Sequence, residues 1–411
     1  MRPRICVLTA GHLATTPRMV KVADALAEEG YDVNVVSTQF FDWGDAGDQS
    51  IVASRWTRWR WTTVDYRKRD AFPRYLLSGL RMRGAKQLMR VRGLKRIGLA
   101  TAARVRERVF SELVSAAAHT RPAFIYGGGS ALAATAVAAR KLGVPFGLDL
   151  EDFQSAQDPP GRYAGVTDKI ERAIFPLAAL LTGGSSAIAE EYRSVYGVDV
   201  IPIHNVFPLP DTAPTIREWD GNLRLYWLGQ TIGPGRGLEE TIRAAGAAEI
   251  TSELTIRGNG SREYVDSLET LATDVAPRLT LTLVTPAPPD AMVDLCRPHD
   301  VGIAIEMPER RSQELALTNK SLTYILAGLA VAMTDTLGQH DLATDLGDGA
   351  LICQPATIID DLAKGLRRWS DNPASLALAK EAAWTAARTR WHWEHPQERG
   401  RMLEAVASVL K

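Results

Sequence analysis

One stretch of the sequence carries residues suited to binding a phosphate group. Glycines recur through residues 229–238, where Arg236 stands between Gly235 and Gly237 at the start of an amphipathic segment. Glycine lets the backbone approach a ligand closely, the first turn of a helix offers free N–H groups, and arginine adds a permanent cation. The spacing matches neither the dinucleotide fingerprint nor the P-loop. The pattern predicts an anion-binding turn, with an unliganded strand-to-helix turn as the alternative.

A second stretch places a lysine at the start of a predicted helix. Asn319 and Lys320 open this helix, which ends at Gly328 before a buried strand. A lysine at a helix N-terminus opposes the helix dipole, so the position is unfavourable unless an anion lies nearby. Lys320 is therefore a candidate second cation for a phosphate, and a side chain that points into water is the alternative.

Acidic residues gather at the end of another predicted strand. Asp149, Glu151 and Asp152 lie within four residues of each other there. Carboxylates in this position could contact a sugar or an acceptor hydroxyl. Two alternatives remain open, a screened surface cluster and a weak metal-binding pair of Asp149 and Glu151.

A glycine loop follows the first predicted strand. Gly11 and His12 open it, and Arg18 lies a few residues later. His12 and Arg18 are candidate ligand contacts, although a lone histidine is more often a surface or capping residue. His392 and His395 form a pair that lacks a recognisable set of further ligands, so we predict no metal site.

Strands and helices that alternate along the chain must position these residues. The apolar runs predict strands at 4–9, 32–37, 123–126, 145–150, 223–228, 254–257, 279–284 and 301–305. Amphipathic segments predict helices at 17–29, 130–142, 168–181, 238–248 and 321–327. This alternation is typical of α/β domains with a parallel sheet covered on both faces.

A proline-rich segment divides the alternation in two. Four prolines fall within residues 202–220, which carry few periodic apolar residues. We expect a Rossmann-like domain at 1–205, a linker at 206–220, a second such domain at 221–385 and a helix within 386–411. The fold class expected is α/β, with two doubly wound Rossmann-like domains facing each other across a cleft.

Together these motifs resemble the donor site of the GT-B glycosyltransferases, in particular the retaining enzymes of family 4. There, a basic residue before glycine and an Asn-Lys helix that ends in Tyr-x-x-Ala-Gly hold the donor diphosphate. The matching positions are Arg236 before Gly237, and Asn319 and Lys320 followed by Tyr324. The resemblance covers most of the chain and implies a last helix that crosses back to the N-terminal domain.

The resemblance also implies which residues form each part of the site. Donor-binding residues would be Gly11, Gly229, Gln230, Gly235, Arg236, Gly237, Gly258, Glu306, Asn319, Lys320, Thr323 and Tyr324. Acceptor contacts would come from His12, Arg18, Asp149 and Glu151.

The sequence departs from the family pattern at three positions. Thr323 stands where the family has the glutamate that holds the donor ribose, and Leu315 stands where an earlier glutamate would fall. Glu306 is the candidate replacement. Glu151 stands where the family often has histidine. The nucleotide and the sugar are therefore left open.

The resemblance implies transfer of a sugar from a nucleotide-sugar donor to an acceptor hydroxyl with retention of configuration. Arg236 and Lys320 would stabilise the leaving diphosphate, and Glu151 and Asp152 would act at the sugar or acceptor. With two fixed cations, we expect neither a metal nor a cofactor. The alternatives are a nucleotide-sugar epimerase or dehydrogenase, and a catalytically inactive, membrane-associated binding protein.

A net charge of zero conceals a strongly basic segment at residues 55–108. It holds 17 Lys and Arg against three acids, a balance of 17 − 3 = +14, which leaves 31 − 45 = −14 elsewhere. Apolar residues recur there at helical spacing: Leu77, Leu80, Leu88, Val91, Leu94 and Ile97. The pattern predicts a basic amphipathic helix on an anionic membrane, and hence a lipid-linked or cell-envelope glycan acceptor. The alternatives are the domain's own packing face and, less favoured, single-stranded nucleic acid; we expect no nucleic acid.

Cysteine use and hydropathy bear on the compartment. The three cysteines are far apart in the sequence and suggest no disulfide framework. The first apolar run, residues 5–10, is too short for a signal-peptide core, and no apolar run reaches about 18 residues. We expect a cytoplasmic protein, peripheral on the inner face of the cell membrane.

Overall fold

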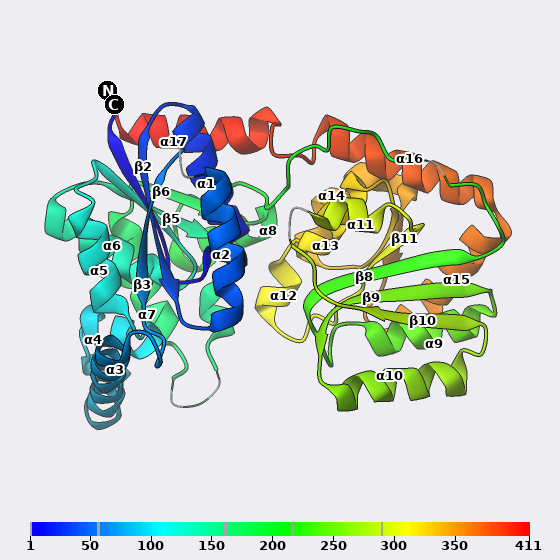
Figure 1. The fold of residues 1–411 in the computed structure, drawn as a ribbon, viewed down its shortest axis with the longest axis horizontal. Helices are drawn as coiled ribbons and strands as arrows, with labels where there is room; N and C mark the ends of the chain where they lie inside the picture. Colours follow the sequence, from blue (N-terminus) through cyan, green and yellow to red (C-terminus); the bar gives the residue numbers. More distant parts are fainter. Residues whose placement is uncertain (1, 56–57, 160, 162, 216, 289–290) are drawn as a thin grey trace. The chain divides into compact units, whose positions relative to one another are not determined.

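The chain forms two compact units, each built around one parallel sheet. The computed structural model describes residues 2–55, 58–159, 161, 163–215, 217–288 and 291–411. One unit comprises Met1–His204 and Arg399–Lys411, and the other comprises Asn205–Glu398 (Figure 1). Among the described residues, every helix is too short or too polar to cross a bilayer.

The sheet of the first unit has seven parallel strands in the order β3-β2-β1-β4-β5-β6-β7. Their bounds are β1 Arg4–Thr9, β2 Asp32–Gln39, β3 Arg60–Asp65, β4 Phe124–Gly128, β5 Phe146–Leu150, β6 Leu180–Gly183 and β7 Ile201–Pro202. The central strands are buried along nearly their whole length, because helices cover both faces of the sheet. The pairing register places Thr9, Gly128, Asp149 and Thr182 in one row near the carboxyl ends.

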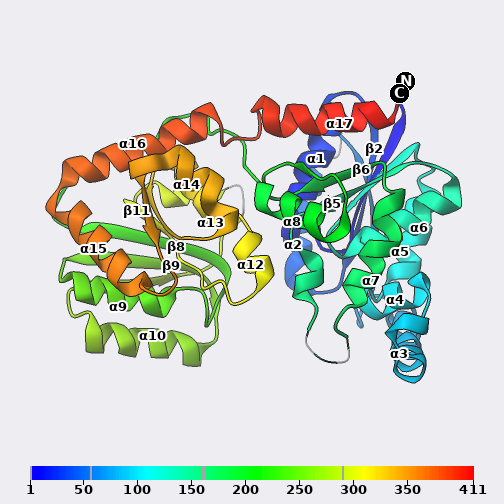
Figure 2. The same ribbon diagram turned by 180° about the vertical axis from the view of Figure 1, so that it is seen from behind.

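The helices of the first unit lie on both faces of its sheet. They are α1 Pro17–Glu28, α2 Asp42–Arg55, α3 Phe72–Arg92, α4 Leu99–Arg106, α5 Phe110–His119, α6 Leu132–Leu142, α7 Val166–Ile174, α8 Ser186–Tyr196 and α17 Arg401–Val409. Figures 1 and 2 show α1 and α2 on one face and α6 and α7 on the other, and α8 packs on α7 through Tyr192 and Tyr196, which contact Glu171. The last helix, α17, packs against α1 and β6.

The prediction of a helix at residues 168–181 is wrong for the second half of this range. The chain leaves the α-helix at Ile174, makes a short 3-10 turn over Phe175–Leu177, and enters β6 at Leu180. Pro176 lacks the N–H that a continuing helix needs, and the apolar residues after it form a buried strand.

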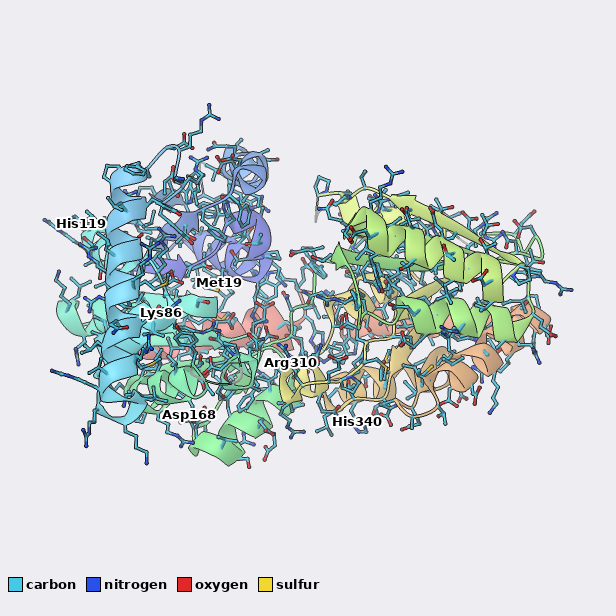
Figure 3. The ribbon with its side chains drawn as sticks, turned by 90° about the horizontal axis from the view of Figure 1, so that it is seen from below. Met19, Lys86, His119, Asp168, Arg310 and His340 are labelled. Atoms are coloured by element: carbon cyan, nitrogen blue, oxygen red, sulfur yellow. The ribbon has the colours of Figure 1, made fainter. Side chains whose placement is uncertain are left out.

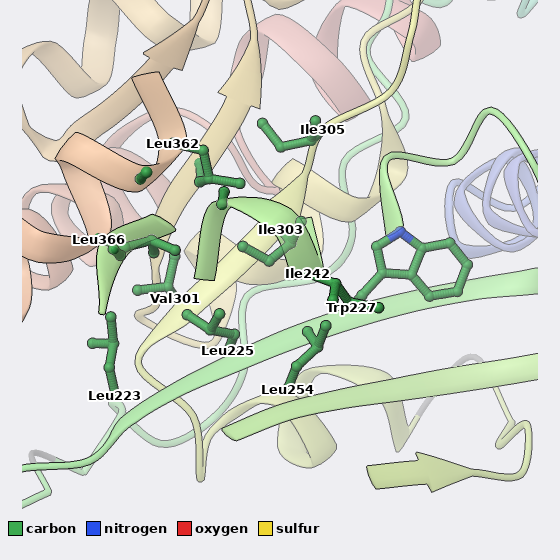
Figure 4. Packing of buried hydrophobic residues seen from close by; sticks show 14 of the residues in the cluster. Leu223, Leu225, Trp227, Ile242, Leu254, Val301, Ile303, Ile305, Leu362 and Leu366 are labelled. Atoms are coloured by element: carbon green, nitrogen blue, oxygen red, sulfur yellow. The ribbon is translucent and has the colours of Figure 1, made fainter. Parts of the chain in front are cut away.

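The second unit has a six-stranded parallel sheet in the order β10-β9-β8-β11-β12-β13. The strands are β8 Leu223–Ile232, β9 Ser252–Gly260, β10 Leu279–Val284, β11 Val301–Ala304, β12 Ala330–Thr334 and β13 Ala350–Cys353. Figure 4 shows its core, where side chains such as Leu225, Ile303 and Leu366 pack together with Trp227.

The helices of the second unit pack in groups. They are α9 Leu238–Ala248, α10 Arg262–Val275, α11 Met292–Cys296, α12 Arg311–Leu315, α13 Asn319–Leu326, α14 His340–Leu346, α15 Ile358–Asp371 and α16 Pro373–Thr389. Helix α9 packs against α10 and α15, and α13 packs against α16 and β11.

The glycine-rich segment at 229–238 is only partly a turn. Strand β8 continues to Ile232, and it pairs with β9 through Thr231 opposite Asn259. The register shifts between Leu228 and Thr231, which accommodates the glycine within the strand as a bulge. The strand-to-helix turn proper is therefore confined to residues 233–237.

The basic helix ends earlier than its apolar spacing predicts. Helix α3 stops at Arg92, and Gly93 follows with φ 77°, so Leu94 and Ile97 lie outside the helix. Ile97 is buried in the first unit instead. Residues 56 and 57 of the basic segment lie outside the described residues.

Candidate functional site

The turn before α9 carries Arg236 to the carboxyl end of the second sheet. Gly235 and Gly237 both have positive φ angles, 72° and 75°, which L-residues with a side chain rarely adopt. A Cβ atom at Gly237 would lie 1.9 Å from the carbonyl oxygen of Ile305. The turn can therefore pack directly on the chain that leaves β11, and the side chain of Arg236 stays 47% exposed.

Lys320 occupies the first turn of α13 with its ammonium group against a carboxylate and an aromatic ring. The Thr318 hydroxyl caps the helix by accepting a hydrogen bond from the Lys320 N–H. The Nζ atom lies 2.6 Å from Glu306 Oε1 and 5.2 Å from the centroid of the Trp227 ring. The side chain is only 9% exposed. The sequence conflict between a lysine and a helix N-terminus is thus resolved by a carboxylate and a π face.

Glu306 joins the two cations. Its Oε1 atom also lies 3.4 Å from Arg236 Nη1, and its backbone N–H donates to the Thr334 hydroxyl at the end of β12. Burial alone would raise the pKa of Glu306, but the charges of Lys320 and Arg236 outweigh burial and hold the pKa below its usual value. Two cations and one carboxylate leave an excess positive charge, which suits a polyanionic ligand.

Tyr324 is a buried residue that connects the two strands leading to Arg236 and Glu306. It is fully buried; its hydroxyl accepts a hydrogen bond from Leu228 N–H and donates one to the Ile303 carbonyl, both at 3.2 Å. A side chain at Gly302 would overlap this ring, because its Cβ would lie 2.1 Å from Tyr324 Cγ. Tyr324 thus fixes β8 against β11, and the expected contact with a donor becomes a positioning function.

Glycines near the ends of β8 and β9 make room for a tryptophan. A Cβ atom at Gly229 would lie 2.4 Å from the Trp227 ring, and one at Gly258 would lie 2.6 Å from the Gly229 carbonyl oxygen. Gln230, the next residue on β8, is exposed. The two glycines let both strand ends lie over the indole that faces Lys320.

The remaining predicted donor residues lie around the start of α13. The Asn319 side-chain oxygen accepts a hydrogen bond from Asn205 at 3.0 Å. Thr323 is buried and donates its hydroxyl to the Asn319 carbonyl. Ser321 contacts Gln339 through a 2.9 Å hydrogen bond. The Thr323 hydroxyl therefore already makes a hydrogen bond within its own helix.

In the first unit, Arg18 and Asp149 form a buried, two-point ion pair. Arg18 Nε and Nη2 lie 2.7 and 2.8 Å from the two Asp149 oxygens, and Arg18 Nη1 donates to the Ile203 carbonyl. Tyr126 and Thr182 donate their hydroxyls to the same carboxylate. Both members of the pair are buried and fully engaged. The expectation that Arg18 and Asp149 contact an acceptor is therefore corrected: they join α1 to β5.

His12 is also engaged inside the first unit. Its Nε2 atom accepts hydrogen bonds from the N–H groups of Phe40 and Phe41, so its Nδ1–H donates to Asp48 at 2.7 Å. The ring is fully buried, and it stacks on Phe41. His12 fixes the passage from β2 to α2 rather than presenting a free ring, as acceptor binding would require. Gly11 beside it accepts a hydrogen bond from Thr38 N–H.

Glu151 and Asp152 follow β5 and remain partly accessible. Burial raises the pKa of Glu151 to about 7, because the neighbouring Arg18 only partly offsets burial and the adjacent carboxylates add to it. Burial likewise raises the pKa of Asp152, against a hydrogen bond from Gln157. A Cβ atom at Gly184 would lie 2.2 Å from the Glu151 carbonyl oxygen, so this glycine lets the loop pack against β6. Glu151 can exchange a proton near neutral pH.

Among the described residues, one cluster has the spacing of metal ligands: His12, Asp45 and Asp48. The Arg67 guanidinium pairs with Asp45, and Asp48 accepts hydrogen bonds from the His12 ring and from the Ala14 N–H. A cation beside Asp45 repels a metal ion, so these donors fit an ion-pair cluster better than a metal site.

One part of the site was missed by the sequence analysis. Trp227 was treated only as part of an apolar strand, although it supplies the aromatic face that contacts Lys320. The signal that could have revealed it is Gly229 two residues later on the same face of the strand. Gln339 also belongs to this region, where its amide donates to the Thr334 carbonyl and accepts from Ser321.

Solved structures share this architecture, although no family model and no curated protein matches the sequence. HepE from Anabaena, solved with UDP and glucose, has 14% identity and a TM-score of 0.69, with 100% of this chain and 99% of that chain covered. The lipopolysaccharide outer core galactosyltransferase WaaB has 11% identity and a TM-score of 0.61, with coverage of 98% and 99%. A candidate UDP-N-acetylglucosamine 2-epimerase from Listeria monocytogenes has 12% identity and a TM-score of 0.58, with coverage of 99% and 96%.

These similarities establish the fold. The two parallel-sheet, Rossmann-like units place this chain among proteins with the GT-B fold. At such low identity, similarity in fold does not carry over activity, which must be argued from the residues of the site.

Proposed function

We propose that the protein is a glycosyltransferase that moves a sugar from a nucleoside-diphosphate sugar to an acceptor hydroxyl. The observation that carries the proposal is the pair of cations, Arg236 and Lys320, converging on one point near the carboxyl ends of β8 and β11. In an open α/β sheet this edge is where ligands bind. The HepE structures, solved in complex with UDP and glucose and with UDP-glucose, agree with this chemistry.

The chemistry follows from where charge develops. As the bond between sugar and diphosphate breaks, negative charge grows on the leaving phosphate. Fixed cations stabilise that charge without reorganising during the reaction. Arg236 and Lys320 supply them, so we propose catalysis without a metal ion. Glu151 and Asp152 are assigned to the sugar or the acceptor hydroxyl, and transfer with retention of configuration is part of the proposal. Proton NMR of the product's anomeric centre, compared with that of the donor, tests retention.

A thermal-shift assay tests the donor site directly. The protein would be screened against UDP, GDP, ADP, CMP and TDP, with and without a chelator. A ligand at a hundredfold excess over Kd stabilises the folded state by about 2.7 kcal/mol. We expect a chelator-insensitive shift with one nucleoside diphosphate, and its loss in Arg236→Ala and Lys320→Ala. No shift with any of the five in the wild-type protein would rule the donor site out.

The acceptor is proposed to be a lipid-linked or cell-envelope glycan, because α3 presents an unusual second apolar face. The face that packs on the first unit carries Ser78, Ala85 and Met89. The apolar residues exposed to solvent are Phe72, Leu76, Leu77, Leu80, Leu88 and Val91. At about 100° per residue, this exposed set lies on the opposite side of the helix. The domain's own packing therefore does not account for these residues.

Arginines border the exposed apolar face of α3. Helical geometry places Arg83 and Arg90 along one border and Arg74, Arg81 and Arg92 along the other, and all five are exposed. An apolar strip between cationic borders complements an anionic lipid surface. Figure 3 shows α3, with Lys86 labelled, in full view on the outside of its unit. We propose that this face rests on the inner face of the cell membrane.

Vesicle sedimentation tests the membrane contact. We expect binding to vesicles that contain phosphatidylglycerol, weaker binding to pure phosphatidylcholine, and release by salt. The double variant Leu80→Ser/Val91→Ser should bind about tenfold less tightly, because it removes apolar area that would enter the lipid. Leu378→Ser, an exposed leucine on α16, is the matched control. Equal binding by the double variant and the control would remove α3 from the contact.

A nucleotide-sugar epimerase is the second candidate, favoured by the similarity to the Listeria structure. Incubation of the protein with UDP-N-acetylglucosamine in the absence of an acceptor separates the two. Conversion of the sugar under these conditions would support the epimerase and contradict the transferase.

A further inference from the structure

The anion that compensates Lys320 in this structure belongs to the protein itself. Lys320 is almost fully buried at a helix N-terminus, where both burial and the helix dipole disfavour a cation. Glu306 Oε1 lies against its ammonium group, and the same oxygen faces Arg236. Removing a buried cation's partner is costly, so some anion must occupy this position in every state of the site.

Glu306 has the freedom to leave that position. Its side chain is 27% exposed, compared with 9% for Lys320, and the 3.4 Å contact with Arg236 is the looser of its two. Among the contacts of the described residues, the further hold on Glu306 is on its backbone, whose N–H donates to the Thr334 hydroxyl. The carboxylate can therefore rotate into water while the chain that carries it stays in place.

We propose that Glu306 is an internal counter-ion that a ligand's diphosphate displaces from Lys320 and Arg236, and that it thereby sets the affinity of the donor site. The inference rests on the proposed function and names a residue that regulates the same site. A carboxylate and a phosphate compete for the same N–H donors, and both are negatively charged. The carboxylate thus balances part of the positive charge of the empty site, and it weakens the hold of the site on the donor and on the nucleotide product.

This assignment differs from one in which Glu306 holds the donor ribose in place of the family's glutamate at position 323. A ribose-holding carboxylate helps binding, and its removal weakens every ligand that carries a ribose. A displaced counter-ion hinders binding, and its removal strengthens ligands that carry a diphosphate. The two roles predict opposite signs for the same substitution.

The experiment measures Kd for UDP, inorganic pyrophosphate and uridine by calorimetry, in the wild type and in Glu306→Gln. Glutamine keeps the shape and removes the charge. Glu269→Gln, an exposed carboxylate on α10, is the control for net charge. We expect Glu306→Gln to bind UDP and pyrophosphate about three- to tenfold more tightly, the range of one partly exposed charge pair, with uridine unchanged. The unliganded variant should also melt at a lower temperature, because Lys320 loses its partner.

Two results would overturn the proposal. Weaker binding of UDP and uridine together would assign Glu306 to the ribose. An unchanged Kd for pyrophosphate would mean that the carboxylate and the phosphate do not compete. Glu306→Asp, which keeps the charge on a shorter side chain, should fall between the wild type and the glutamine variant, and it replaces that variant if the latter fails to fold.

Failure of the proposed function can be told apart from failure of this inference. Suppose that the wild type binds pyrophosphate, that Glu306→Gln binds it more tightly, and that no nucleoside diphosphate binds. The counter-ion role of Glu306 is then supported, and the proposed nucleotide-sugar donor is ruled out. If UDP binds the wild type but Glu306→Gln leaves the Kd values unchanged, then the donor site is supported and the counter-ion role of Glu306 is ruled out.

Discussion

The carboxyl group of Glu151 can change its charge at neutral pH. Burial raises the pKa of this group to about 7, so ionised and protonated forms coexist there. An ionised carboxylate accepts a hydrogen bond from an acceptor hydroxyl, whereas the protonated form does so less well. The ionised fraction grows as the pH rises through 7, and the proposed contact with the acceptor should strengthen with it.

We therefore expect kcat/KM for the acceptor to rise between pH 6 and pH 8. Glu151→Gln should lower it by at least about tenfold and flatten this rise, while Kd for the nucleotide stays unchanged. Steady-state kinetics with varied acceptor provide the measurement, and Glu190→Gln on α8 is the control. A glutamine variant that keeps the wild-type pH profile would exclude Glu151 from the acceptor contact.

Single residues of the site could be predicted where the residue type is unfavourable for its own position in the local sequence. Lys320 stood out because a lysine at a helix N-terminus is locally unfavourable, and Arg236 stood out between glycines. Arg18 and Asp149 could not be understood in this way, because their ion pair joins residues 131 positions apart and exists only in the folded chain. An arginine and an aspartate near predicted strand ends look alike whether they bind each other or a ligand.

At the level of elements, α7 and α8 enclose a carboxyl group that resists ionisation. Glu171 is fully buried and accepts hydrogen bonds from Tyr192 at 3.0 Å and Tyr196 at 2.6 Å. Burial raises its pKa from 4.5 to about 7, although the tyrosine hydrogen bonds oppose the rise. A raised pKa in the folded state gives stability that is present below pH 4.5 and is lost as the pH rises through 7.

Glu171→Gln should remove this part of the pH dependence. We expect the wild type to lose stability between pH 5 and pH 8 relative to the variant, which keeps an oxygen for one tyrosine. Urea unfolding at a series of pH values measures the difference. Parallel curves for the two proteins would show that Glu171 ionises as it does in the unfolded chain.

The elements were predicted only in part. Most central strands of both sheets were predicted from apolar runs, because parallel strands covered on both faces are apolar throughout. Strands β3, β6, β7 and β13 and helix α15 were not predicted. The extension of β8 through Gly229 was not predicted, since it depends on pairing with β9. In α3 the apolar spacing did predict a helix, but it could not tell which apolar face is buried.

At the level of the whole molecule, the chain returns to the first unit after completing the second. Helix α17 packs against α1 and β6, and its Met402 and Val406 are fully buried there. Arg399 adds a 3.2 Å ion pair with Glu28 on α1. The last helix is thus part of the first unit's core, although residues 205–398 separate it from that unit in sequence.

Met402→Ala tests this arrangement. A buried methionine truncated to alanine costs about 2–5 kcal/mol of unfolding free energy. We expect hydrogen exchange to become faster in α1 and β6, while β8 and α9 of the second unit keep their protection. Equal acceleration in both units would mean that α17 does not belong to the first unit alone.

The position of α17 at the end of the chain also determines the order in which the two units can be completed during synthesis. A ribosome releases the chain from its N-terminus onward, so residues of the first sheet emerge long before the helix that completes their core. The second unit, which is continuous in sequence, can become complete while the first still lacks α17. Until then the surface of α1 and β6 that α17 covers remains open to water, so the core of the first unit is completed only at the end of synthesis.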